Sequence, residues 1–191
     1  MPSASGIIEN QAVAKRLCHP ASRPDRPLMR LALYEPDIPQ NAGTILRLSA
    51  CLGVAADIIE PCGFVFDDRR LRRAGMDYLD AVDLTRHSSW NSYRVWRAGS
   101  DRAGRLILLT TKGDTPYTDF SYAPSDTLMF GRESGGVPPE VHEAADARLV
   151  IPMKPGLRSL NIAVAAAMVL GEALRQTEGF PARTADDPAE R

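Results

Sequence analysis

The sequence is poor in the features that mark secreted, metal-binding or membrane proteins. Its three cysteines, Cys18, Cys51 and Cys62, are an odd number without a C-x-x-C pair, so a disulfide framework is not expected. The three histidines lie in no zinc spacing, although His19 follows Cys18 directly, and we expect no metal. No run approaches the ~18 apolar residues of a membrane helix, and no secretory signal opens the chain. These absences predict a cytoplasmic protein that does not enter membranes.

Several nucleotide-binding and hydrolase motifs are also missing. The sequence contains no G-x-G-x-x-G after a strand, no G-x-x-x-x-G-K-[ST] and no G-x-S-x-G. An ordinary dinucleotide-binding domain, a P-loop nucleotide hydrolase and an α/β-hydrolase are therefore disfavoured. The formal net charge is −1, so binding of a nucleic acid would depend on a local basic patch.

The length and the proline pattern predict one domain with two irregular ends. A chain of 191 residues favours a single domain. Residues 1–28 carry four prolines and no Phe, Trp or Tyr, which is typical of a flexible N-terminal extension. Residues 179–191 are likewise expected to be a tail. We therefore expect residues 29–178 to fold.

Short apolar runs alternate with segments of helical spacing, which predicts an α/β fold. Strands are expected at 30–34, 54–60, 81–87, 105–111, 127–131 and 148–153. Helices are expected at 44–53, 67–75, 88–99, 138–146 and 159–177. This order implies a mainly parallel sheet with helices on both faces. Ligands of such sheets bind at the carboxyl ends of the strands, which directs attention to the loops after Tyr34, Phe130 and Ile151.

Two of these loops contain unusual residue patterns. FGRESGGVPPE (130–140) places three glycines around an Arg–Glu pair, and glycines allow the backbone to approach a ligand closely. A plain strand-to-helix turn is the alternative. In the second loop Gly156 provides a bend, Ser159 is expected to cap the last helix, and Asn161 is expected inside it, held by tertiary contacts. A simple buried helix is the alternative there.

The third loop, IPQNAGTILR (38–47), precedes the first helix. Asn41 and Gly43 are expected in the turn, with Arg47 one helical turn further on. Free backbone amides at a helix start suit a phosphate or a carboxylate, and we expect Arg47 to reach the same ligand, toward the end of the first strand.

In this order, the three segments resemble the three motifs of the SPOUT RNA methyltransferases. The matching residues are Asn41, Gly43 and Arg47, then Phe130, Gly131, Glu133 and Gly136, then Ile151, Pro152, Met153, Ser159, Leu160, Asn161 and Ala165. Further segments, among them LYEPDIPQNAGTILRL and DDRRLRRAGMDYLD, resemble the enzymes that 2′-O-methylate cytidine or uridine 34, the wobble nucleotide of tRNA. Gly171 departs from the larger residue found in some relatives.

The resemblance implies a C-terminal trefoil knot, a homodimer, the cofactor S-adenosylmethionine with S-adenosylhomocysteine as product, and the anticodon stem-loop of tRNA as partner. The implied cofactor-binding residues are Leu109, Thr110, Gly131, Gly136, Ile151, Met153, Ser159, Leu160 and Asn161. A ribosomal RNA methyltransferase and a non-catalytic RNA-binding protein of the same fold are the alternatives.

Two residues are candidates for the chemistry. An arginine keeps its proton, so Arg47 is expected to fix a phosphate and to favour the developing alkoxide rather than to act as a base. Glu133 is the alternative base, or else it caps the knot loop.

A basic cluster is the candidate RNA-binding surface. It consists of Arg69, Arg70, Arg72 and Arg73, to which we add Asn41 and consider adding His87 and Lys112. A solvated helix face is the alternative reading of the arginines. Trp90 and Trp96 are expected in the core.

Overall fold

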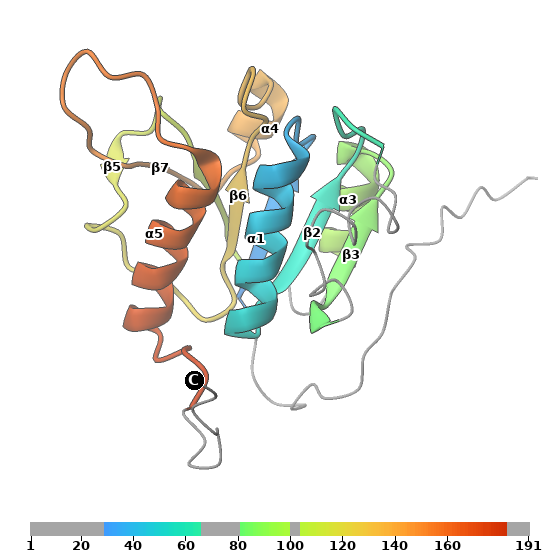
Figure 1. Cartoon of the computed structure of the whole chain (residues 1–191), viewed down its shortest axis with the longest axis horizontal. Helices are drawn as coiled ribbons and strands as arrows, with labels where there is room; N and C mark the ends of the chain where they lie inside the picture. The colour runs from blue at the N-terminus through green and yellow to red at the C-terminus, as the bar shows by residue number, and fades with distance from the viewer. Residues whose placement is uncertain (1–28, 66–80, 100–103, 183–191) are drawn as a thin grey trace, which may run out of the picture.

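The computed structural model describes residues 29–65, 81–99 and 104–182, and in these residues seven strands form one parallel sheet (Figure 1). The strands are β1 (Arg30–Tyr34), β2 (Ala55–Ile59), β3 (Leu84–His87), β4 (Leu106–Leu109), β5 (Thr115–Pro116), β6 (Thr127–Phe130) and β7 (Ala147–Val150). Their order across the sheet is β3-β2-β1-β6-β4-β7-β5. The predicted α/β class and parallel sheet are confirmed.

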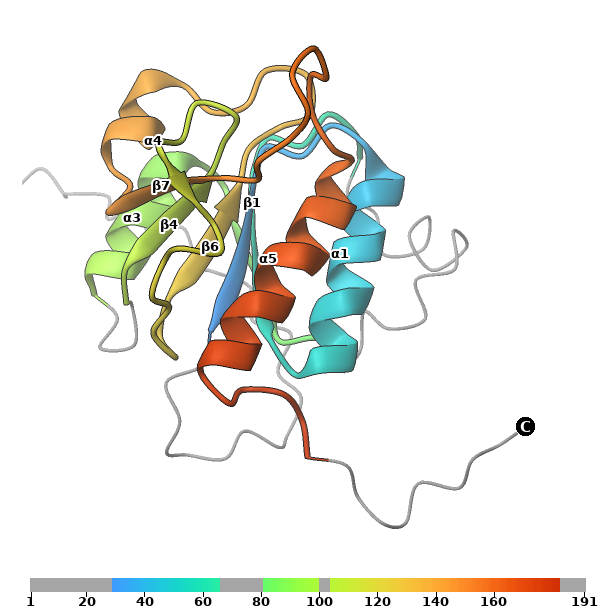
Figure 2. The same ribbon diagram turned by 90° about the vertical axis from the view of Figure 1, so that its left-hand side faces the viewer.

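Helices cover both faces of the sheet, as predicted. They are α1 (Pro39–Leu52), α3 (Trp90–Ala98), α4 (Pro139–Glu143) and α5 (Ile162–Gln176). Helices α1 and α5 lie side by side on one face, and α3 and α4 lie on the other (Figures 1 and 2). Each face buries its own apolar cluster, one with Ile45 and Val169 from α1 and α5, the other with Tyr93 and Val141 from α3 and α4. The sheet is thus shielded from water on both sides, as parallel sheets usually are.

Helix α1 begins five residues before the predicted start, so Asn41 lies in its first turn, Gly43 lies just after that turn, and neither belongs to the preceding loop. Proline is a poor residue for a helix interior, but Pro39 occupies the first helical position, where its missing N–H costs no hydrogen bond. The segment Pro-Gln-Asn-Ala-Gly therefore looks like a loop in the sequence although a helix begins within it.

Helix α5 begins at Ile162, so the predicted cap at Ser159 is wrong. Asn161 is the capping residue, and its side-chain oxygen accepts hydrogen bonds from the backbone amides of Ala163 (2.9 Å) and Val164 (3.3 Å). The two-residue strand β5 was not predicted, because two residues show no periodicity.

Three predictions are not tested by the described residues. The predicted basic helix at 67–75 and the extension at 1–28 lie outside them, and so does most of the tail from 179. The bounds of the folded domain and the trefoil knot also stay predictions. Within the described part of the chain, no helix is long and apolar enough to cross a membrane.

A buried charge cluster joins the first three strands. The side chain of Asp57 on β2 is fully buried and accepts two hydrogen bonds from Arg30 (2.7 and 2.9 Å), while His87 on β3 lies 2.9 Å away. The guanidinium of Arg30 also lies over the ring of Trp96, 5.0 Å from its centroid. His87 is only 3% exposed, so its suggested contact with RNA is wrong and its role is structural.

We expect Asp57→Asn to lower the free energy of unfolding by about 3–5 kcal/mol, because it removes the carboxylate that pairs with the largely buried Arg30 cation. Burial alone would raise the pKa of Asp57, but the hydrogen bonds from His87 and Arg30 outweigh it and hold the pKa below its ordinary value. The stabilisation is therefore complete above the unfolded-state pKa, about 4, and is lost as the pH falls through the lower folded-state value.

Urea unfolding of wild type and variant between about pH 7 and 3 measures both effects. Glu143→Gln is the control, since Glu143 is an exposed residue of α4, and it should unfold like the wild type. Equal stability of Asp57→Asn and wild type at neutral pH would contradict the assignment.

Candidate active site

A cavity of about 590 Å³ lies where the carboxyl ends of β4, β6 and β7 meet the start of α5. This volume is in the range of sites that bind small ligands. Its lining includes all nine residues proposed from the sequence for cofactor binding: Leu109, Thr110, Gly131, Gly136, Ile151, Met153, Ser159, Leu160 and Asn161. Asn41 and Glu133 line it as well. The three sequence motifs, up to 120 residues apart, therefore meet at one place.

The loop after β6 is a tight backbone turn that requires glycine at two positions. The backbones of Arg132 and Gly136 exchange two hydrogen bonds (3.0 and 2.8 Å), and Gly136 has a φ of +68°, which L side chains rarely adopt. A Cβ on Gly131 would lie 2.6 Å from the carbonyl carbon of Gly136. The glycines thus let two backbone segments touch beside the cavity.

A second close approach lies between the loop after β4 and strand β7. A Cβ on Gly113 would come within 2.6 Å of the Leu149 carbonyl carbon. The Thr110 amide donates to the Leu149 carbonyl (2.9 Å), and the Gly113 amide donates to the Thr110 carbonyl (3.2 Å). This wall of the cavity is therefore formed by backbone held against backbone.

Glu133 is part of a hydrogen-bond network that joins the three motif segments. One oxygen accepts the backbone amide of Asp37 (3.0 Å), and the other accepts the side-chain amide of Asn41 (3.0 Å). Asn41 in turn accepts a hydrogen bond from the side-chain amide of Asn161 (3.0 Å), and Asp37 accepts the backbone amide of Ser134 (2.9 Å). Since both Glu133 oxygens are engaged, the geometry favours the loop-capping role over that of a base. The same network uses Asn41, the proposed RNA contact, as a link between loops.

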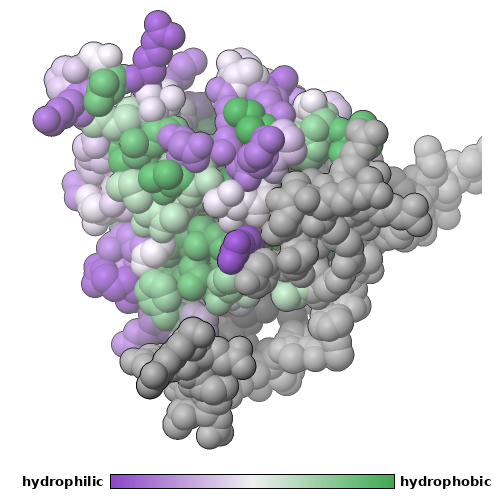
Figure 3. Space-filling model, viewed as in Figure 1, coloured by the Kyte–Doolittle hydropathy of each residue, from purple (hydrophilic) through white to green (hydrophobic). Residues whose placement is uncertain are grey.

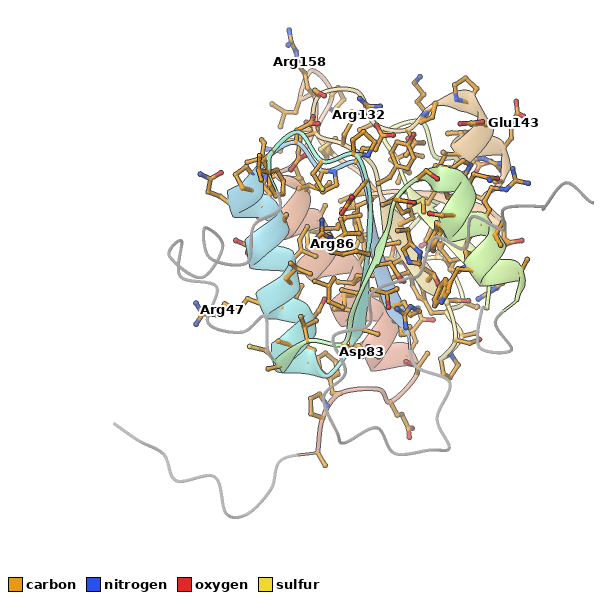
Figure 4. All side chains as sticks on the ribbon, turned by 90° about the vertical axis from the view of Figure 1, so that its right-hand side faces the viewer. Arg47, Asp83, Arg86, Arg132, Glu143 and Arg158 are labelled. Carbon is orange, nitrogen blue, oxygen red and sulfur yellow. The ribbon has the colours of Figure 1, made fainter. Side chains whose placement is uncertain are left out.

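The cavity lining combines apolar strand ends with polar loops. Leu108, Phe130 and Leu149 are buried residues of β4, β6 and β7, whereas Ser159 and Arg158 are exposed residues of the loop before α5. Figure 4 shows Arg158 and Arg132 at the end of the molecule that carries these loops. Such a lining suits a ligand with an aromatic part and a charged part.

Arg47 does not line the cavity. It lies on the exposed face of α1, and Figure 4 shows it directed away from the sheet. Eight residues of helix separate it from Pro39, which at the usual rise is roughly 12 Å along the axis. The expectation that its guanidinium reaches the carboxyl end of β1 is therefore wrong within one copy of the chain. Arg69, Arg70, Arg72 and Arg73 lie outside the described residues.

Sequence reasoning missed several cavity residues. His142 lines the cavity but lies outside all of the segments singled out, whereas Ile38, Val137 and Ala165 lie within them but were not proposed to contact the ligand. Ile38 and Val137 could have been found from the loops that contain them, but nothing in the sequence indicated His142. Among the described residues, no group of three or more histidine, cysteine or acidic side chains could hold a metal ion.

Comparisons with known proteins agree on one family. The sequence model described as the SpoU rRNA Methylase family matches residues 28–171. A tRNA (cytidine(34)-2′-O)-methyltransferase from Beijerinckia indica is 63% identical over 158 residues, which are 83% of this chain and 97% of that protein.

Two solved structures are similar as well. One, from work on the 2-OH methylation of C/U34 on tRNA, has a TM-score of 0.71 and 39% identity and covers 78% of this chain and 97% of that one. The other is the SpoU methyltransferase AviRb from Streptomyces viridochromogenes in complex with the cofactor AdoMet. Its TM-score is 0.70 and its identity 26%, covering 79% of this chain and 58% of that one.

Proposed function

The chain belongs to the SpoU rRNA methylase family, and we propose that it transfers a methyl group from S-adenosylmethionine to the ribose 2′-hydroxyl of the tRNA wobble nucleotide, cytidine or uridine 34. The observation that carries this proposal is the similarity over nearly the full length of a tRNA (cytidine(34)-2′-O)-methyltransferase. A tRNA substrate fits action in the cytoplasm.

The cavity fits S-adenosylmethionine in shape and in chemistry. The close approach of Gly131 to the Gly136 backbone shapes the loop that lines one side of the cavity. The buried ends of β4, β6 and β7 offer an apolar surface to the adenine, while Asn161 and Ser159 offer polar atoms to the charged amino-acid part. We therefore assign the nine cavity residues predicted from the sequence to cofactor binding.

Held by the cavity residues, the cofactor would supply an electrophilic methyl group to the 2′ oxygen, whose hydroxyl proton would pass to water while S-adenosylhomocysteine is released. Glu133 fixes the loop after β6 to the start of α1 through its hydrogen bonds to Asp37 and Asn41. Asn161 fixes the start of α5 against the same network. Arg47 holds an RNA phosphate and stabilises charge that develops on the 2′ oxygen.

A homodimer explains how Arg47 takes part although it lies away from the cavity of its own copy. Apolar residues gather on the face formed by α1 and α5 (Figure 3). Val164 (50% exposed) and Met168 (38%) lie on α5, and Ile38 (41%) precedes α1. An exposed patch of this kind is typical of an interface. We propose that a second copy covers it and places its α1, with Arg47, near the RNA bound at the first cavity.

Light scattering at micromolar concentration should give twice the 20.8 kDa mass of one chain. Val164→Glu and Met168→Glu together should shift the protein toward the monomer, because two charges would be buried at the interface. Val95→Glu is the matched control, since Val95 is 65% exposed on the opposite face of the sheet, on α3. A monomeric wild type would contradict the dimer.

The activity is tested by transfer of labelled methyl from S-adenosylmethionine to unmodified tRNA transcripts. We expect label in a tRNA with cytidine or uridine at position 34 and none when that nucleotide carries a 2′-deoxyribose. Label in ribosomal RNA fragments alone would support the ribosomal alternative. Binding of RNA without transfer to any substrate would support the non-catalytic one.

A further inference from the structure

The lysine, arginine and acidic residues that line the cavity are mostly cations, although the whole chain carries a formal net charge of −1. Lys112, Arg132 and Arg158 come from the loops after β4, β6 and β7. Glu133 is the only acidic residue that the described part of the chain adds to the lining. A protein of this net charge needs a local basic surface to bind RNA, and the cavity has one at its mouth.

Two of the three cations have no acidic partner. Arg132 is paired with Glu35, whose carboxylate oxygen lies 2.5 Å from the guanidinium. Within residues 29–65, 81–99 and 104–182, neither Lys112 nor Arg158 forms an ion pair with an acidic side chain. Both residues are exposed, so an anion that approaches the cavity from solvent can reach them. We call Lys112 and Arg158 the rim cations.

The backbone fixes the places from which the rim cations extend. A hydrogen bond from the Gly113 amide to the Thr110 carbonyl (3.2 Å) closes a tight turn after β4, and Lys112 lies at its tip. The Lys112 amide also donates to the Thr110 hydroxyl (3.2 Å). Arg158 follows a second turn, in which Gly156 has a φ of +89°, and Figure 4 shows its side chain extending outward from this end of the molecule. Both cations therefore stand where the strands end.

The chemistry of the substrate determines which anion comes to this place. The reacting 2′ oxygen is attached to the carbon next to the one that carries the 3′ phosphate of the same nucleotide, whereas the 5′ phosphate is attached two carbons further along. When the 2′ oxygen reaches a methyl group held in the cavity, the 3′ phosphate is therefore the nearest charged group of the RNA. The cofactor competes little for the cations, because its amino-acid part carries an ammonium together with its carboxylate.

We propose that the rim cations bind the phosphate on the 3′ side of the target ribose and so position the 2′ hydroxyl for methyl transfer. This inference rests on the proposed function. Lysine and arginine bind phosphates through charge-assisted hydrogen bonds, and such contacts fix the register of a protein on a nucleic acid. Unlike Arg47, which the second copy supplies, Lys112 and Arg158 belong to the copy whose cavity holds the cofactor.

The first test measures methyl transfer to tRNA by the full-length Lys112→Ala and Arg158→Ala variants. Each should lower kcat/KM for tRNA about tenfold, as expected for loss of a charge-assisted hydrogen bond. The double variant should also lower the salt dependence of tRNA binding by about one unit of slope. Lys112→Arg, which keeps the charge, should retain most of the activity. Arg94→Ala, which removes an exposed cation on α3, is the control and should change neither quantity.

The second test identifies the phosphate. A tRNA ligated from synthetic fragments carries a neutral amide linkage in place of the phosphodiester on the 3′ side of nucleotide 34. The wild type should lose as much activity on this tRNA as the double variant loses on natural tRNA, and the double variant should lose nothing further, because both changes remove the same contact. An amide linkage on the 5′ side should cost the wild type and the double variant the same factor.

Melting temperatures and the affinity for S-adenosylhomocysteine should be those of the wild type in all variants, since both side chains are exposed. Wild-type turnover of the double variant would show that the rim cations are only a solvated surface and would overturn the inference. Equal losses of both enzymes on the 3′ amide linkage would overturn it too, as would a loss of S-adenosylhomocysteine affinity that parallels the loss of turnover. A wild type that methylates no tRNA would instead contradict the proposed function.

Discussion

Replacing Arg47 by alanine should slow methyl transfer to tRNA at least ~100-fold, which corresponds to about 2.7 kcal/mol of lost transition-state stabilisation. Arg47→Lys should lose a similar amount, since a guanidinium binds a phosphate through two parallel hydrogen bonds and an ammonium cannot. The affinity for S-adenosylhomocysteine should stay near that of the wild type, because Arg47 does not line the cavity. Single-turnover transfer of labelled methyl and calorimetry measure the two quantities.

Arg94→Ala is the matched control for this experiment. Arg94 is also an exposed helical arginine, but it lies on α3, on the opposite face of the sheet. Its loss should change turnover little, whereas a general effect of surface charge would affect both variants. Near-normal turnover of Arg47→Ala would show that Arg47 has no role in methyl transfer and would leave Glu133 as the remaining candidate.

Gly131→Val should abolish measurable binding of S-adenosylmethionine. The sequence alone suggests that a side chain at this position would occupy cofactor space, but the structure gives a more direct reason. The added Cβ would lie 2.6 Å from the Gly136 carbonyl carbon, so the backbone turn itself must open. Since both residues line the cavity, opening the turn reshapes the site, while the strands below it are preserved.

Gly99→Ala is the control for this prediction, because Gly99 follows α3, does not line the cavity, and a Cβ there would meet the Val95 carbonyl oxygen only at 3.6 Å. It should bind the cofactor like the wild type. Circular dichroism of Gly131→Val should show the wild-type content of helix and strand. Normal cofactor binding by Gly131→Val would place the site elsewhere.

The strands of the sheet could be predicted because the sequence marks them as short, nearly continuous runs of apolar residues. Runs such as Leu31–Tyr34 and Leu106–Leu109 are nearly continuous in apolar residues, which is typical of strands covered on both faces. Helix starts were harder to predict. Gly43 disfavours a helix by local propensity, and packing of α1 against the sheet and α5 overrides that preference. Pro39 is compatible with the first helical position, but it looks like a helix breaker when the start of the helix is not known.

The site was predictable where the sequence resembles family motifs and not elsewhere. The resemblance identified residues that do meet at one cavity, but it could not orient Arg47, because the direction of a helix face depends on where the whole helix packs. It also missed His142. Nothing in the sequence Val-His-Glu distinguishes a histidine that lines the cavity from one elsewhere on the surface.

The central claim, 2′-O-methylation of the tRNA wobble nucleotide by this chain, is tested most directly by mass spectrometry of tRNA. Transfer RNA is isolated from a strain lacking the gene and from the same strain carrying the wild-type gene or the Arg47→Ala variant. We expect a 2′-O-methylated cytidine or uridine at position 34 only with the wild-type gene, and its loss in the other two strains. Full methylation of position 34 in the deletion strain would contradict the account.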